Sequence, residues 1–276
     1  MRKAGKQESR KQTKRDIYAR YGIEYNPKTG KIDAPLFGWV RPLLINGNGK
    51  LGRAVWTFSM LPGNVWYHID MGGGDFWDIC GTCPCNCPGC YAQTGRYNCS
   101  NVKAANARKT ALVRLALDFV RRALLAQIEA DNIRICRIHA AGDFDGPAYV
   151  DMWRSVIKAT PTTIYWTYTK VEYAEKAFDD LENINVVKSL IPGHGLNYGP
   201  AGYIMAVYRA LVEKGVAVYI CRCGVDKNQH CTNCRGCYEN PVVLFLEHST
   251  DYEPQKDPNY PAFVALVESQ ARPVAA

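Results

Sequence analysis

The sequence predicts an α/β protein built as a complete or partial (β/α) barrel of mainly parallel strands. After residue 130, strand-like segments alternate with helix-like segments. This alternation implies parallel βαβ connections, and several such units in one row favour a barrel over a doubly wound sheet. The chain has 276 residues, which is long enough to bury the core that such a fold needs.

The segment before this alternation predicts an N-terminal hairpin followed by a long helix. Aromatic and β-branched residues recur over Leu36–Met60, on both sides of an Asn-Gly-Asn-Gly turn at residues 46–49. Such a turn between strand-like runs is a strong hairpin signal. The helix is expected to begin at Ser100 or Asn101, which suit a capping position, and to continue to about Ile128.

The elements of the alternating part follow from apolar periodicity and from helix-ending residues such as Pro161. Strands are expected at Ile133–Ala140, Thr163–Tyr168, Ile184–Leu190, Val216–Ile220 and Val242–Glu247. Helices are expected at Ala148–Ala159, Val171–Leu181 and Ile204–Lys214.

Positive charge is concentrated at the N-terminus. The formal charge of the chain is +8, and residues 1–20 contain eight basic residues against two acidic ones. We therefore divide the chain into a basic, flexible arm (1–20), one barrel-like domain (21–250) and a C-terminal tail (251–276). The arm is expected either to bind nucleic-acid phosphates without sequence selectivity or to act only as a solvated terminus.

Ten of the 12 cysteines form two groups, which we call the first and second cysteine patches. The first patch consists of Cys80, Cys83, Cys85, Cys87 and Cys90, and the second of Cys221, Cys223, Cys231, Cys234 and Cys237. Cysteines this close in sequence indicate a shared metal or a disulfide framework. No apolar stretch near the N-terminus suits a signal peptide, and no run is long enough for a membrane span. We therefore expect a soluble, cytoplasmic protein with metal-bound cysteines.

The first patch leaves two ligand sets open. Cys80, Cys83, Cys87 and Cys90 would form a closed four-ligand site for iron–sulfur or zinc, which suits a structural or electron-transfer role. Without Cys80, the remaining three have the spacing C-x3-C-x2-C, which resembles the motif of the radical S-adenosylmethionine enzymes. Cys85 belongs to neither set.

The resemblance to that superfamily implies a [4Fe–4S] cluster with one iron open to S-adenosylmethionine, and a reductant for activity. It also implies a glycine-rich turn that holds the amino group of the cofactor, for which Gly142 and Asp143 are the candidates. The family has an aromatic residue before the last cysteine. Here that place is Gly89, and Tyr91 follows the motif as the candidate beside the cofactor. A simple strand-to-helix turn is the alternative interpretation of Gly142 and Asp143.

The second patch predicts a separate centre. Cys231, Cys234 and Cys237 have the spacing C-x2-C-x2-C, and Cys223 or Cys221 would be the fourth ligand. A second [4Fe–4S] cluster and a structural zinc both suit these thiolates. Because both patches follow expected strands, we expect them at the same face of the barrel, where strands end.

A second resemblance covers more of the chain. The blocks LGRAVWTFSMLPG, CPGCYAQTGRY, RIHAAGDFDGPAYVDMW, YWTYTK and CTNCRGCYEN occur in order over residues 45–240. They are similar to the blocks of a phage family named for gene product 88. The resemblance implies a viral or mobile-element origin, hence the host cytoplasm, and a metal-cluster fold, but no reaction.

Three polar residues at expected strand ends are weaker candidates for contacts with a substrate: His139, Thr169 and Lys170. Two functions follow from the sequence. One is an iron–sulfur enzyme resembling the radical S-adenosylmethionine superfamily, acting on nucleic acid or in a modification pathway. The other is a non-catalytic, metal-stabilised protein that binds nucleic acid through the basic arm.

Overall fold

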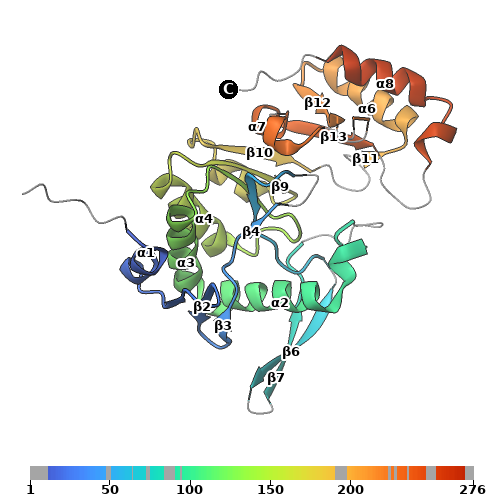
Figure 1. The fold of residues 1–276 in the computed structure, drawn as a ribbon. Helices are drawn as coiled ribbons and strands as arrows, with labels where there is room; N and C mark the ends of the chain where they lie inside the picture. The colour runs from blue at the N-terminus through green and yellow to red at the C-terminus, as the bar shows by residue number, and fades with distance from the viewer. Residues whose placement is uncertain are drawn as a thin grey trace, which may run out of the picture.

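The computed structural model describes residues 12–47, 51–63, 65–72, 75–83, 91–93, 95–189, 198–222, 225–226, 229–234, 236–246 and 253–270. A five-stranded sheet lies near the middle of the molecule, in the order β10-β9-β8-β5-β4 (Figure 1). These strands span Ile184–Lys188, Ile164–Thr169, Ile135–Ile138, Val55–Thr57 and Ile45–Asn46. The pairs from β10 to β5 are parallel, whereas β4 runs antiparallel to β5 across the predicted hairpin turn. The strands β5, β8 and β9 therefore end at one edge of the sheet.

Helices α2, α3, α4 and α5 pack on one face of this sheet and form the main core with it. They span Ser100–Leu115, Leu117–Ala130, Pro147–Ala159 and Glu172–Ala177. The single helix expected up to Ile128 is interrupted at Ala116, where φ is −143° and ψ is 48°. Alanine favours helix, so tertiary packing rather than local sequence sets this break.

The opposite face of the central sheet packs against the C-terminal part of the chain. Along β9, Tyr165 points to the helices, whereas Trp166 and Tyr168 point to the opposite face. There Trp166 and Tyr168 pack with the second cysteine patch. A parallel sheet of order β11-β13-β12 follows, carrying α6 and α8 (Figure 1). The elements of this part are β11 Tyr198–Gly199, α6 Ala201–Glu213, β12 Val218–Ile220, η4 Cys231–Asn233, α7 Gly236–Glu239, β13 Val242–Leu246, η5 Pro254–Lys256 and α8 Tyr260–Ser269.

Part of the expected arm belongs to the folded body. Helix α1, Lys14–Arg20, begins with a capping box between Thr13 and Asp16, and its Tyr18 is buried. Ion pairs from both ends of α1 reach Asp131 and Glu129, next to the end of α3. Likewise, α8 lies within the expected tail, and its Phe263 and Val267 are buried against α6 and the C-terminal sheet.

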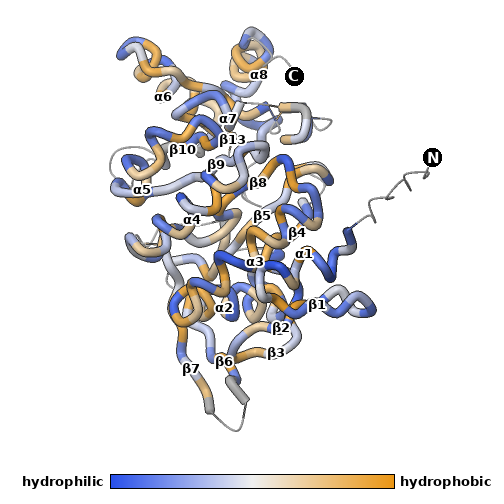
Figure 2. The backbone as a smooth tube through the Cα atoms, turned by 90° about the vertical axis from the view of Figure 1, so that its left-hand side faces the viewer, coloured by the Kyte–Doolittle hydropathy of each residue, from blue (hydrophilic) through white to orange (hydrophobic). Residues whose placement is uncertain are grey.

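Two antiparallel sheets complete the fold. One contains β1 Tyr25–Asn26, β2 Lys31–Ala34 and β3 Gly38–Val40. The other is a hairpin of β6 Trp66–Gly72 and β7 Asp75–Cys80, which projects from the molecule below α2 (Figures 1 and 2). Short helices η1 Tyr91–Gln93 and η2 Gly95–Asn98 precede α2. None of the helices in these ranges is long and apolar enough to cross a bilayer.

The prediction of a barrel is wrong. The strands of the described ranges form four separate open sheets, and two of these sheets are wholly antiparallel. Alternation of strands and helices correctly predicts parallel pairing between β8, β9 and β10. Closure fails because the face of β9 with Trp166 and Tyr168 packs on the cysteine-rich segment instead of a barrel interior.

Candidate functional site

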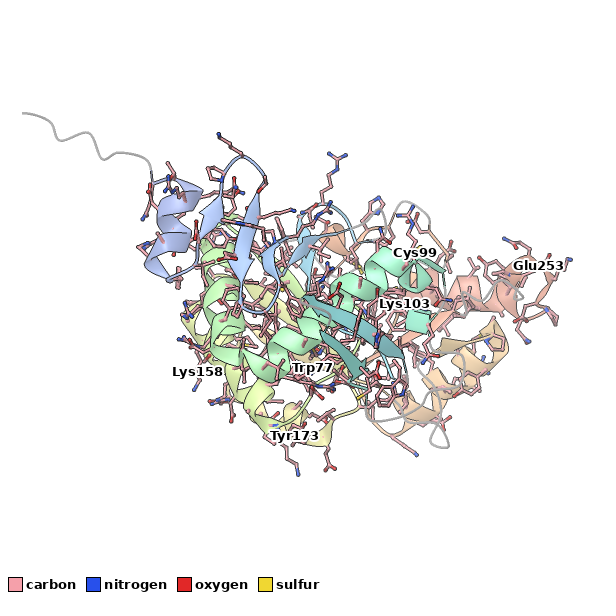
Figure 3. All side chains as sticks on the ribbon, turned by 90° about the horizontal axis from the view of Figure 1, so that it is seen from below. Trp77, Cys99, Lys103, Lys158, Tyr173 and Glu253 are labelled. Carbon is pink, nitrogen blue, oxygen red and sulfur yellow. The ribbon has the colours of Figure 1, made fainter. Side chains whose placement is uncertain are left out.

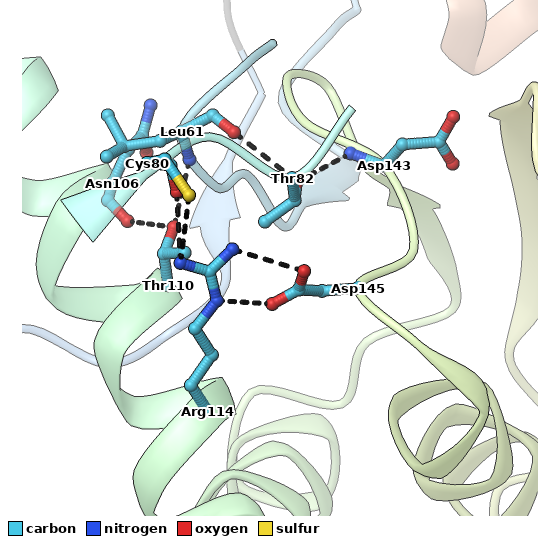
Figure 4. Close-up of polar contacts among 8 residues, drawn as sticks. All are labelled: Leu61, Cys80, Thr82, Asn106, Thr110, Arg114, Asp143 and Asp145. Carbon is cyan, nitrogen blue, oxygen red and sulfur yellow. Dashed lines mark hydrogen bonds and ion pairs between the residues drawn. The ribbon is translucent and has the colours of Figure 1, made fainter. Parts of the chain in front are cut away.

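The chain of the first cysteine patch is fixed to the edge of the sheet where β5, β8 and β9 end. The hydroxyl of Thr82 accepts a hydrogen bond from the backbone N–H of Asp143 at 2.9 Å and donates one to the Leu61 carbonyl at 3.3 Å (Figure 4). Thr82 lies between Cys80 and Cys83. The structure therefore brings the first patch and the turn after β8 together, as the sequence predicts.

Asp143 ties this turn to the end of β9. Its Oδ1 accepts hydrogen bonds from the Phe144 N–H at 2.8 Å and the Thr169 hydroxyl at 2.6 Å, and its Oδ2 accepts one from the Lys170 N–H at 3.0 Å. Burial raises the pKa of Asp143, while these hydrogen bonds act in the opposite direction. Three predicted site residues are thus in contact. The side chain of Asp143 is only 3% exposed, so the geometry suits positioning of the edge better than direct contact with a ligand.

Gly142 allows the close approach of these segments. Its φ is +82°, a region that favours glycine. A Cβ at this position would lie 2.9 Å from Thr82 Oγ1 and 3.0 Å from Met60 Cβ. Gly142 is therefore required by both its conformation and its neighbours, as the predicted close backbone approach implies.

His139 is buried just behind this edge. Its Nε2 forms a 2.9 Å hydrogen bond with the Tyr149 hydroxyl, whereas its Nδ1 has no partner. Burial lowers the pKa of His139 to about 3, with a smaller contribution from Arg137, so the imidazole is neutral near pH 7. Its φ of +59° is unusual for a residue with a side chain. His139 therefore lies behind the edge as a core residue.

Lys109 is a functional candidate that the sequence analysis missed. Its amine lies 5.3 Å from the centre of the Phe58 ring and has no hydrogen-bond partner. Burial lowers the pKa of Lys109 to about 7. The ring of Phe58 also packs edge-on against His139. The sequence did contain a signal for its burial. Lys109 precedes Leu112 and Val113 at helical spacing, so it lies on the same apolar side of the helix.

Arg114 connects the first patch to the turn as well. It pairs with both carboxylate oxygens of Asp145, and it donates to the carbonyl of Cys80 at 3.1 Å and to its Sγ at 3.6 Å (Figure 4). Cys80 and Cys83 are partly exposed. Three cysteines of the patch, Cys85, Cys87 and Cys90, lie outside the described residues, and Tyr91 is described only by its backbone in η1.

The cysteines of the second patch gather in a different environment. Cys221, Cys234 and Cys237 are buried in one apolar cluster with Trp166 and Tyr219, and Cys231 packs against the same cluster. The Tyr168 hydroxyl donates to Cys237 Sγ at 2.7 Å, and the Tyr219 hydroxyl lies 3.5 Å from Cys234 Sγ. Cys223 lies outside the described residues.

The close approach of two segments in the second patch depends on glycine. A Cβ at Gly236 would lie 2.1 Å from the ring of Tyr219, so only glycine lets α7 approach β12. Cys221 directly follows the carboxyl end of β12. The patch as a whole, however, packs on Trp166 and Tyr168 and so covers a face of the central sheet. The two patches therefore do not share one barrel face.

Metal binding by either patch stays a prediction. Within the described residues, no group of three or more His, Cys, Asp or Glu side chains is placed closely enough to hold an ion. The donor set itself suits a metal: Cys221 comes from the end of β12, Cys231, Cys234 and Cys237 come from the stretch of η4 and α7, and the four thiols meet in one cluster.

Comparisons with known proteins agree with one of the two resemblances. The family model described as gene product 88 matches residues 42–251. The gene 88 protein of Mycobacterium phage L5 is 37% identical over 60 residues, covering 18% of this chain and 25% of that protein. The gene 88 protein of Mycobacterium phage D29 is 31% identical over 96 residues, covering 27% and 40%. The aligned parts thus span less than half of each relative. No solved structure matches the chain, and the resemblance to the radical S-adenosylmethionine enzymes is not supported.

Proposed function

The chain belongs to the gene product 88 family, and we propose that it is a metalloprotein whose two cysteine patches hold separate thiolate-bound centres. The observation that carries the proposal is the meeting of Cys221, Cys231, Cys234 and Cys237 in one cluster. Soft thiolate ligands suit an iron–sulfur cluster or a tetrahedral zinc. Gathering several thiols in one buried cluster gains little by itself, whereas a bound metal contributes directly to folding.

The first patch would hold the second of the two centres. Cys80, Cys83, Cys87 and Cys90 are its candidate ligands. The hydrogen bond from Arg114 to Cys80 Sγ supports this assignment, because donors to sulfur stabilise negative charge on a ligating thiolate. The centre would lie beside the edge formed by Thr82, Asp143 and Thr169.

The test is the metal content of protein purified without oxygen, measured as iron, acid-labile sulfide and zinc per chain. We expect metal in the wild type, loss of one centre in Cys83→Ser, and loss of the other in Cys234→Ser. Cys99→Ser is the matched control, because Cys99 is exposed, lies at the start of α2 and belongs to neither patch (Figure 3). A wild type without metal, or one in which these thiols are oxidised to disulfides, would refute the proposal.

A second candidate function concerns the first patch alone. The link from Thr82 to Asp143 joins this patch to the carboxyl edge of a parallel sheet, where ligands bind in many α/β proteins. A centre ligated by Cys83, Cys87 and Cys90 only would leave a position open for S-adenosylmethionine. The reduced protein would then bind this cofactor and release methionine and 5′-deoxyadenosine. If Cys80 closes the centre, neither binding nor release occurs, and Cys80→Ser separates the two cases.

Nucleic-acid binding through the basic N-terminus is a further proposal. Because α1 packs into the core, the appropriate truncation removes residues 1–11 only, which contain five basic residues and one acidic residue. Counterion release predicts that this truncation weakens binding to DNA or RNA and makes it less sensitive to salt. Equal affinity and equal salt dependence of the two proteins would assign these residues to another role.

A further inference from the structure

The hairpin β6–β7 has one face packed on the body of the protein and one face exposed. In its register, Trp66 lies opposite Cys80, His68 opposite Asp78, and Asp70 opposite Phe76. Paired residues lie on the same side of a sheet. We call the side of these pairs the outer face, which contains Trp66, His68, Asp70, Phe76, Asp78 and Cys80.

The inner face fixes the hairpin to α2. Ile69 and Ile79 are buried in one cluster with Ala107 and Ala111 of that helix. The hairpin is thus held to α2 by its inner face and by Cys80 at its end, which accepts hydrogen bonds from Arg114. This attachment requires neither Trp66 nor Phe76.

The outer face is rich in exposed aromatic surface. Trp66 is 68% exposed and Phe76 is 54% exposed, the two largest values among the exposed apolar side chains. The rings of His68 and Phe76 stack with their centres 4.6 Å apart and an angle of 7° between their planes. Trp77, on the other side of the same hairpin, is also exposed (Figure 3). Aromatic surface gathered in this way marks interaction sites more often than scattered exposed residues do.

The charge of the hairpin indicates a cationic partner. Residues 65–80 contain Asp70, Asp75 and Asp78 and no lysine or arginine, in a chain whose formal charge is +8. Asp78 pairs with His68 at 2.7 Å through one carboxylate oxygen, and its side chain stays 70% exposed. Such a segment repels the phosphates of nucleic acids and attracts cationic side chains. Guanidinium groups stack on aromatic rings and pair with carboxylates, so an arginine side chain is suited to both features of the outer face.

The backbone of the hairpin offers a template for an extended segment. Among the described residues, β6 and β7 pair only with each other, so each has an edge without a neighbouring strand. Open edges accept an additional strand from another chain, and alternate side chains of that strand then lie over one face of the sheet.

We propose that the hairpin β6–β7 docks an extended, arginine-rich segment of another protein, which adds as a strand and places its cationic side chains over Trp66, Phe76 and the neighbouring carboxylates. The inference rests on the aromatic and acidic side chains of the hairpin and does not require a bound metal. The candidate ligand Cys80 lies at the end of the same face, opposite Trp66.

The test uses a fluorescent peptide of alternating arginine and threonine, with a peptide in which glutamate replaces each arginine as its matched control. Fluorescence anisotropy should show binding of the arginine peptide only. The double variant Trp66→Ala and Phe76→Ala should weaken it at least about tenfold, since two cation–π contacts are removed. Asp78→Asn should weaken it less and reduce its salt dependence. Trp39→Ala, which removes a 41% exposed tryptophan on β3, should change nothing.

Other outcomes would overturn the proposal. These are equal binding of both peptides, no binding of the arginine peptide to the wild type, and binding of a short oligothymidine that the double variant abolishes. Concentration-dependent dimers that the double variant abolishes would instead assign the face to a second copy of this chain. Thermal unfolding of each variant shows whether it is folded, and the Asp78→Asn variant keeps the test decisive if the double variant is not.

Discussion

The two cysteine patches lie in environments of opposite polarity. Cys80 and Cys83 are partly exposed and lie next to Thr82 and Arg114, within a network of hydrogen bonds and an ion pair. Cys221, Cys234 and Cys237 are at most 9% exposed and pack among aromatic rings. The difference indicates different roles. A buried centre contributes mainly to folding, whereas a centre on a polar, partly exposed edge is accessible to a ligand or an electron donor.

The largest expected effect is a loss of stability, and it tests this comparison at the buried patch. Cys234→Ser should lower the free energy of unfolding by about 4 kcal/mol, because it removes a ligand of a centre whose binding contributes to folding. Cys83→Ser should lower it by less than about 1 kcal/mol. Denaturant unfolding measures both values, with Cys99→Ser as the exposed control. Equal losses in the first two variants would contradict the assignment of separate roles.

A second prediction concerns the close packing at the first patch. Gly142→Ala should destabilise the protein by about 2–4 kcal/mol, because the new methyl group meets Thr82 and Met60 at a φ of +82°. Gly146→Ala is its matched control: φ is +106° there, but a methyl group added at this position would meet no heavy atom within 4 Å. Its loss should be smaller and should reflect backbone strain alone. If thermal unfolding shows equal losses, crowding against Thr82 contributes nothing.

A third prediction sharpens the description of the core behind the first patch. Lys109→Met should stabilise the protein by about 1–3 kcal/mol at pH 7, since it replaces a buried amine that has no hydrogen-bond partner. Lys103→Met on the same helix is the control, because Lys103 is only partly buried (Figure 3). A loss of stability in Lys109→Met would show that the amine has a partner in solution, such as an anionic ligand.

The pH dependence of stability tests the same groups, with a smaller effect per pH unit than these substitutions have. The folded-state pKa of Lys109 is about 7, below the ordinary value of 10.5. As the pH falls between these values, the unfolded chain binds a proton that the folded chain does not, so stability falls by up to about 1.4 kcal/mol per pH unit. For His139, the corresponding loss occurs from 6.5 down to about 3. Lys109→Met should abolish only the loss at higher pH. Thermal unfolding from pH 3 to 10 measures both losses of stability. If Lys109→Met has the same pH profile as the wild type, the loss assigned to Lys109 is contradicted.

The sequence predicts many of the local elements and which strand ends lie side by side, while the roles of the site residues stay predictions. Alternating apolar segments correctly indicate β8, β9 and β10 and their parallel pairing, and the strand ends correctly bring Asp143, Thr169 and Lys170 together. The expected membership in the gene product 88 family is confirmed. These inferences succeed because they rest on short-range patterns and on the shared direction of parallel strands.

Long-range arrangement could not be predicted in the same way. Sequence periodicity shows that Trp166 and Tyr168 lie on one side of β9, but it does not show that the second cysteine patch covers that side. The expected barrel therefore proved wrong. The break at Ala116 and the burial of Lys109 have no local signal of comparable strength, because both depend on how α2 packs against the rest of the core.

The central claim is that the second patch is a metal centre of cysteine thiolates, independent of the first. X-ray absorption at the metal edge of the Cys83→Ser protein tests it most directly, because this variant leaves only the second centre intact. The account predicts a bound metal with a sulfur-only first shell, at about 2.3 Å if the metal is zinc. A shell of nitrogen and oxygen ligands, or a variant that has lost all of its metal, would contradict it.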